Sequence, residues 1–125
     1  EGPKGGPGMR EMLAITGALK GAGLGSTVAL ITDGHLSGLV CKGLVVAEVS
    51  PEGAVCGPLA LARDGDTVTI DLETQRCDLE VDEEEMAKRR AAWTPSKPQF
   101  DSGWLQIYRR NVGPLTKGAV LVDPQ

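Results

Sequence analysis

The chain has 125 residues, a length that suits a single domain. Hydrophobic residues make up 41% of it and aromatic residues only 3%, so its core must be mainly aliphatic. The net charge of −4, with no block of Lys or Arg, argues against nucleic acid as a partner, and no apolar run approaches the ~20 residues that span a bilayer.

The first eight residues, EGPKGGPG, are rich in glycine and proline and contain one lysine, Lys4. Two interpretations of this stretch are open. It is either a disordered tail or an ordered loop, whose closely spaced glycines let backbone amides approach an anion such as a carboxylate or a phosphate.

Residues 9–20 predict a helix, because their apolar side chains recur with the i, i+3, i+4, i+7 spacing of one helical face. Gly21 and Gly23 supply its C-terminal stop. Glu11 falls in the first turn of this predicted helix, where a carboxylate suits the helix dipole. The dipole alone is therefore a sufficient structural reason for an acidic residue at this position.

Residues 26–31 form a short apolar run rich in β-branched side chains, which predicts a buried strand. The segment TDGHLSG follows at residues 32–38 and brings polar side chains to the mouth of that strand. It is either a Gly/Ser turn between two strands or a loop that holds a ligand. A Ser-His-Asp hydrolase site is a poor interpretation, because residues that alternate along one short segment rarely meet in triad geometry.

The middle of the chain predicts further short elements. Residues 43–49 form a second apolar strand. Ser50 and Pro51 open a short helical turn as its N-cap and first helical residue. Residues 59–62 predict a short strand, and residues 63–66 predict a turn.

Two segments with alternating polar and apolar residues, 67–72 and 76–81, should pair as antiparallel strands. Residues 94–98 read as a linker-like break, residues 102–111 as a short helix, and residues 118–122 as a last strand or extended tail. Short strands followed by peripheral helices indicate a compact, barrel-like domain of mixed α/β class.

Residues 82–93 predict a strongly charged helix. Asp82 as N-cap and Glu85 three residues later form the pattern of a capping box. The acidic start and the basic residues 88–90 both complement the helix dipole. This run of charge is interpreted as a solvated helix face and not as a binding patch.

Two segments together resemble the C-terminal domain of the dihydroxy-acid dehydratase and sugar-acid dehydratase family. In that family E-G-P-K-G-G-P-G-M-x-E-M is followed by a strand and a T-D-G-x-x-S-G loop, and residues 1–12 and 32–38 match both motifs. Residues 50–54, 57–58 and 64–66 also fall where the family has similar segments. The resemblance extends over nearly the whole chain, and its opening motif is long and unusual in composition.

The resemblance implies a swivelling β/β/α barrel-like domain and a hydro-lyase. Such an enzyme dehydrates a small-molecule 2,3-dihydroxy carboxylate to a 2-keto acid in branched-chain (valine/isoleucine) amino-acid biosynthesis. It implies Mg²⁺ and an iron–sulfur cluster, whose cysteine ligands lie in the family's N-terminal domain. We therefore expect this chain to be the C-terminal part of a longer enzyme, inactive alone, partnered by its own N-terminal domain, homodimeric at full length, and cytoplasmic (organellar in a eukaryote).

The family's functional residues can be carried over one by one. Glu11 matches the glutamate that binds the divalent metal, a role that suits Mg²⁺ because this hard cation prefers carboxylate oxygen. Ser37 matches the serine proposed as general base, which needs nearby cationic charge to hold its alkoxide. The residues expected to shape the substrate pocket are Lys4, Gly5, Gly6, Arg10 and Gly38.

The chain also departs from the family pattern. The family loop usually reads T-D-G-R-F-S-G-G, whereas His35, Leu36 and Leu39 replace Arg, Phe and the second Gly here. The altered pocket wall leaves two alternatives open. The protein is either a sugar-acid (aldonate or phosphogluconate) dehydratase with the same chemistry, or a non-catalytic swivelling or oligomerisation module.

The cysteines are not assigned to the cluster. Cys41, Cys56 and Cys77 are widely spaced and form no C-x-x-C pattern, and His35 is the only histidine, so no zinc pattern is present. We interpret all three as free thiols in a reducing compartment.

Overall fold

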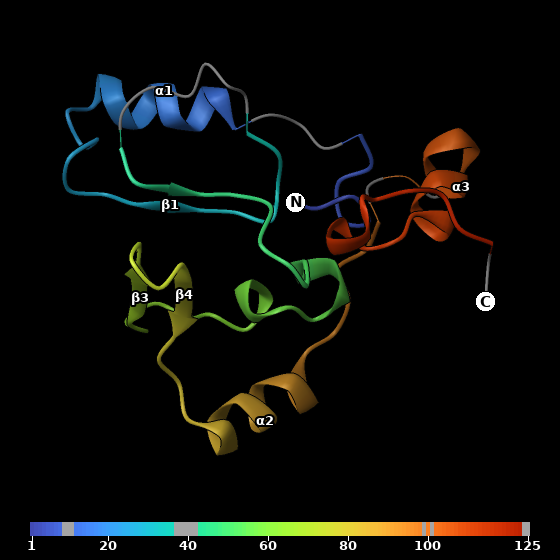
Figure 1. Ribbon diagram of the computed structural model, residues 1–125. Coiled ribbons are helices and arrows are strands. Elements are labelled where there is room, and N and C mark those ends of the chain that lie inside the picture. Colours follow the sequence, from blue (N-terminus) through green and yellow to red (C-terminus); the bar gives the residue numbers. More distant parts are fainter. Residues whose placement is uncertain (9–11, 37–42, 99, 101, 124–125) are drawn as a thin grey trace.

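The computed structural model describes residues 1–8, 12–36, 43–98, 100 and 102–123 (Figure 1). These residues form a small domain of mixed class, in which helices and short strands alternate along the chain. The α-helices are α1 (Leu13–Gly21), α2 (Glu83–Ala92) and α3 (Gly103–Asn111). The strands are β1 (Leu30–Ile31), β2 (Val45–Val46), β3 (Val68–Asp71) and β4 (Arg76–Leu79), and the 3₁₀ turns are η1 (Gly53–Val55), η2 (Pro58–Ala60) and η3 (Leu115–Lys117).

Helix α1 runs alongside the β1–β2 pair (Figure 1). Its predicted glycine stop is confirmed: Gly23 takes the left-handed conformation, with φ 74°. The N–H of Gly23 donates to Lys20, and the N–H of Leu24 donates to Leu19, which satisfies the last carbonyls of the helix. The helix begins at Leu13, later than predicted, and Glu11 lies outside the described residues.

The two predicted apolar strands are real but short. Strand β1 keeps only the last two residues of the expected run, because the N–H groups of Thr27 and Val28 both turn back to the carbonyl of Leu24. Strand β2 pairs with β1 in parallel, with Leu30 opposite Val45. Because the two strands are parallel, the loop after β1 and the segment after β2 lie side by side.

Two predictions for residues 50–62 are wrong. The turn that Ser50 and Pro51 were expected to open begins instead at Gly53, with Glu52 extended before it. The strand expected at residues 59–62 is the 3₁₀ turn η2, which Pro58 starts in the first helical position that proline favours.

The predicted hairpin and the following helix are confirmed. Strand β3 pairs antiparallel with β4, with Val68 opposite Leu79. Asp82 caps α2 by accepting a hydrogen bond from the N–H of Glu85 at 2.8 Å. The cap is local in sequence, so both elements could be predicted without tertiary information.

The basic end of α2 is only partly solvated, which corrects the interpretation of residues 88–90. The Lys88 side chain is 65% exposed, but that of Arg89 is only 10% exposed. The Arg89 guanidinium donates to both carboxylate oxygens of Asp66, to the Leu61 carbonyl and to Glu85. Its hydrogen bond lowers the pKa of Asp66, and the same arginine lowers the pKa of Glu85. Arg89 therefore fastens α2 to the turn that precedes β3.

The barrel is not seen in the described part of the chain. Its strands form two separate two-stranded sheets, β1–β2 and β3–β4. The C-terminal segment is extended and pairs with the end of α3 through a Val112–Leu121 bridge. The mixed class is thus confirmed, and a closed barrel is absent among the residues that the structure describes.

Candidate functional site

The loop after β1 is built by short-range hydrogen bonds. The buried hydroxyl of Thr32 accepts from the N–H of Gly34 at 2.9 Å, which turns the chain sharply as the strand ends. The segment after β2 is hydrogen-bonded to this loop through the backbone. The N–H of Glu48 donates to the Gly34 carbonyl, and the N–H of Val49 donates to the Thr32 carbonyl. The loop is therefore fixed on the sheet as far as the structure describes it.

Asp33 ties this loop to the 3₁₀ turn η1. Its Oδ2 atom accepts a hydrogen bond from the N–H of Gly53 at 2.7 Å. The two residues are 20 positions apart in sequence. The aspartate of the T-D-G motif thus serves a structural contact in this chain.

The glycine-rich N-terminal loop is ordered, and its backbone amides bind a carboxylate of the same chain. The Glu52 carboxylate, in a residue only 5% exposed, accepts from the N–H of Lys4 at 2.9 Å and from that of Gly5 at 2.8 Å. The loop also closes on itself, since Gly6 donates to the Gly2 carbonyl. Of the two interpretations of this stretch, the ordered loop is the one observed. The anion that its backbone amides contact is the side chain of Glu52 in the same chain.

The N-terminal loop packs against two other parts of the fold. A Cβ atom placed on Gly34 would lie 3.2 Å from the backbone nitrogen of Glu1, so the two backbones approach closely. Arg109 of α3 donates to the Lys4 carbonyl at 2.9 Å. Figure 1 shows the loop lying beside α3 and the C-terminal segment.

The two motif segments meet at their described ends. The N–H of Met12, the residue after Glu11, donates to the carbonyl of His35 at 3.2 Å. His35 lies two residues before Ser37, and its ring Nδ1 is 2.9 Å from Glu48 Oε1. The chain leading away from Glu11 therefore touches the chain leading into Ser37.

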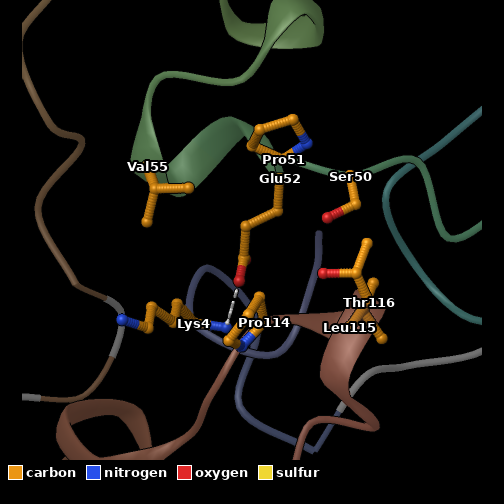
Figure 2. Close-up of a pocket in the computed structure, with 8 residues that line it drawn as sticks. All are labelled: Lys4, Ser50, Pro51, Glu52, Val55, Pro114, Leu115 and Thr116. Atoms are coloured by element: carbon orange, nitrogen blue, oxygen red, sulfur yellow. Dashed lines mark hydrogen bonds between the residues drawn. The ribbon is translucent and has the colours of Figure 1, made fainter.

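A cavity of about 290 Å³ adjoins the Glu52 segment. Figure 2 shows its lining, in which the Glu52 carboxylate points at the backbone of Lys4 while the Lys4 side chain extends away from it. Most of the lining is apolar, and it comes from the N-terminal loop, the η1 segment and η3. The lining residues are Lys4, Ser50, Pro51, Glu52, Val55, Pro114, Leu115 and Thr116.

The predicted site residues divide into two groups. Lys4, Gly5 and Gly6 belong to the ordered loop, and the N–H groups of Lys4 and Gly5 are taken by Glu52. The remaining predicted residues, Arg10, Glu11, Ser37 and Gly38, lie outside the described residues.

The described part of the chain shows neither a cluster of metal ligands nor a membrane-spanning helix. It holds no group of three or more His, Cys, Asp or Glu side chains that could bind a metal ion. Cys56, at the end of η1, and Cys77, in β4, are free thiols, while Cys41 lies outside the described residues. Among the described helices, none is both long and apolar enough to cross a membrane.

Sequence reasoning missed the part played by Glu52. It lies in the segment SPEGA, residues 50–54, for which the sequence predicts a helical turn and a resemblance to the family but no binding role. A signal was present, because a loop whose glycines expose amides needs an anion, and Glu52 is an acidic residue within a motif segment. Nothing local connects Glu52 to Lys4, which is 48 residues away.

The chain is similar to known proteins over almost its whole length. Residues 1–119 match the family model described as Dihydroxy-acid/6-phosphogluconate dehydratase C-terminal. The chain is 55% identical over 122 residues to the dihydroxy-acid dehydratase of Sulfurisphaera tokodaii, covering 98% of this chain and 22% of that protein. It is 56% identical over 120 residues to the dihydroxy-acid dehydratase of Parvibaculum lavamentivorans, covering 96% of this chain and 21% of that protein. The chain thus spans about a fifth of the length of these relatives.

Proposed function

The chain belongs to the dihydroxy-acid/6-phosphogluconate dehydratase family, as a C-terminal domain, and on this premise we propose that it is the C-terminal part of a dihydroxy-acid dehydratase. The reaction is the removal of water from a 2,3-dihydroxy carboxylate to give a 2-keto acid for branched-chain amino-acid biosynthesis. One structural observation carries the proposal. The Met12–His35 hydrogen bond joins the residue that follows Glu11 to a residue two positions before Ser37, which supports this assignment.

The chain's own contribution to the chemistry is a base. Ser37, as an alkoxide, takes the weakly acidic C2 proton of the substrate onto its Oγ atom while the C3–O bond breaks and hydroxide leaves. The proton on Oγ then passes to this hydroxide, which completes the water and restores the alkoxide. The resulting enol tautomerises to the 2-keto acid. A serine alkoxide needs cationic charge close by, so Ser37 works only in the complete enzyme.

Glu11 is proposed as one ligand of Mg²⁺. A single carboxylate fits this ion, which is commonly held by one or two carboxylates and completed by water and substrate. We assign the other protein ligands of this ion to the N-terminal domain. When bound, Mg²⁺ supplies positive charge for the substrate carboxylate and for the charge that develops beside it. The iron–sulfur cluster is assigned to the N-terminal domain.

The surface supports a large intramolecular partner. Several big apolar side chains are open to solvent, including Leu72 at 73%, Trp104 at 67% and Val120 at 55% exposed. Burial of these side chains under another part of the protein would be favourable. We assign that cover to the N-terminal domain of the same protein. A cytoplasmic homodimer remains part of the proposal.

The substrate is proposed to be a branched dihydroxy acid, because the relatives that are 55–56% identical are named for that reaction. The test is 2-keto acid formation by the full-length protein, assayed without oxygen and with Mg²⁺. A branched 2,3-dihydroxy acid, gluconate and 6-phosphogluconate are compared by kcat/KM. Preference for the branched acid is the expected result. Preference for either sugar acid supports the sugar-acid alternative, and no turnover of any of the three supports the non-catalytic module.

A further inference from the structure

Glu52 is a buried carboxylate that the proposed reaction does not use. It is 5% exposed, and its partners are the backbone N–H groups of Lys4 and Gly5, at 2.8 to 3.1 Å. Hydrogen bonds from backbone N–H groups to an ionised carboxylate are stronger than those between neutral groups. Figure 2 shows the side chain reaching from the η1 segment to the N-terminal loop.

Gly53, the next residue, is hydrogen-bonded to the loop after β1. The N–H of Gly53 donates to Asp33 Oδ2 at 2.7 Å, and Asp33 belongs to the loop after β1. Glu52 and Gly53 are consecutive, so one short segment is hydrogen-bonded both to the N-terminal loop and to the loop after β1. One loop leads to Glu11, and the other leads to Ser37.

The N-terminal loop is shaped to receive this carboxylate. A Cβ atom on Gly2 would lie 2.7 Å from both the Cβ and the Oε2 of Glu52, a distance that real Cβ atoms do not tolerate. Gly2 therefore has a steric reason to be glycine. A methyl group at this position would push the carboxylate away from the N–H groups of Lys4 and Gly5.

We propose that Glu52 is a positioning residue, which sets the glycine-rich loop, and through it Glu11, against the loop that leads to Ser37. This inference rests on the proposed function for the roles of Glu11 and Ser37. Glu52 itself touches neither substrate nor metal. Its effect is expected in Mg²⁺ affinity and kcat, because both depend on where the loop holds Glu11.

The first test is Glu52→Gln in the full-length protein, with Glu84→Gln as its matched control. The glutamine amide group replaces one acceptor oxygen by a donor, so the N–H of either Lys4 or Gly5 comes to face an NH₂ group where it now faces an oxygen. The Glu84 side chain is 81% exposed and pairs only with Lys88 among the interactions described. We expect Glu52→Gln to speed hydrogen exchange in residues 1–8 at least tenfold, weaken Mg²⁺ binding at least fivefold and lower kcat at least tenfold.

The second test keeps the carboxylate and moves it. Gly2→Ala places a methyl group against Glu52. The control Gly17→Ala adds one in α1, where no heavy atom other than the nearby backbone of the helix lies within 4 Å. Gly2→Ala should reproduce all three changes, and Gly17→Ala should produce none of them. Agreement between two different perturbations of the same contact excludes a failure of folding specific to one variant.

The outcomes separate the inference from the proposed function. If Glu52→Gln and Gly2→Ala lower only the unfolding midpoint, while loop exchange, Mg²⁺ affinity and kcat match the wild type, Glu52 is merely structural and the inference is overturned. If the wild type forms no 2-keto acid, the proposed function fails. Hydrogen exchange in residues 1–8 then still decides whether Glu52 holds the loop.

Discussion

The backbone N–H of Met12 lies 3.2 Å from the carbonyl oxygen of His35 and donates a hydrogen bond to it. The bond joins the start of α1 to the loop after β1, although the two residues are separated by all of α1 and all of β1. In sequence, Met12 follows Glu11 directly, and His35 lies two residues before Ser37. The first two predictions concern Ser37 and Glu11.

Ser37→Ala in the full-length protein should lower kcat by about 10²–10⁴-fold, because the alanine cannot take the C2 proton. Mg²⁺ binding should stay unchanged, since the hydroxyl is not proposed as a ligand. Ser102→Ala is the control, because Ser102 is exposed and makes no side-chain cap to α3. Near-wild-type turnover by Ser37→Ala with the metals still bound would remove Ser37 as the base.

Glu11→Gln should abolish measurable Mg²⁺ binding or weaken it by about 100-fold, the upper end for loss of groups that support a metal site. An amide oxygen is a poorer partner than a carboxylate for a hard cation. Calorimetric titration of the full-length protein with Mg²⁺ measures the effect, and Glu84→Gln again serves as the control. Unchanged affinity would show that the metal is held without Glu11.

Gly57→Ala should destabilise the protein by about 3 kcal/mol, a large value for a single substitution. A Cβ atom on Gly57 would lie only 1.8 Å from the carbonyl oxygen of Pro51, so the backbone itself must move. The urea midpoint of the full-length protein reports the loss. Gly21→Ala is the control, since no heavy atom lies within 4 Å of its added Cβ, and its midpoint should not fall.

Stability should decline in acid through Asp66. The hydrogen bond from Arg89 holds the pKa of Asp66 below its ordinary value of 3.8. The unfolded chain therefore takes up the proton first, so this stabilisation is complete above the ordinary pKa and is lost as the pH falls through the lower folded-state pKa. Asp66→Asn should unfold more easily at neutral pH and depend less on pH below about 4.

Urea midpoints measured at neutral pH and in steps down to about pH 2.5 test this sign. Asp64→Asn is the control, because it removes an exposed carboxylate from the same turn. Parallel pH profiles for the wild type and Asp66→Asn would show that the Arg89 contact contributes no pH dependence.

The residues themselves determined the elements whose contacts are local. The β3–β4 hairpin follows from alternation on either side of a turn, and the start of α2 follows from Asp82 and the amide three residues later. The end of α1 follows from Gly23, because glycine adopts a positive φ without steric cost. The family could also be identified in this way, from the motif at residues 1–12 and the T-D-G-x-x-S-G loop.

Tertiary structure decided what depends on groups far apart in the chain. The Glu52 carboxylate accepts from the N–H groups of Lys4 and Gly5 across 48 and 47 residues. Arg89, expected on a solvated helix face, forms a half-buried ion pair with Asp66. Local patterns record neither contact, because burial of a charged group is favourable only where the fold supplies its partner. For the same reason a glycine-rich segment with the composition of a tail became an ordered loop.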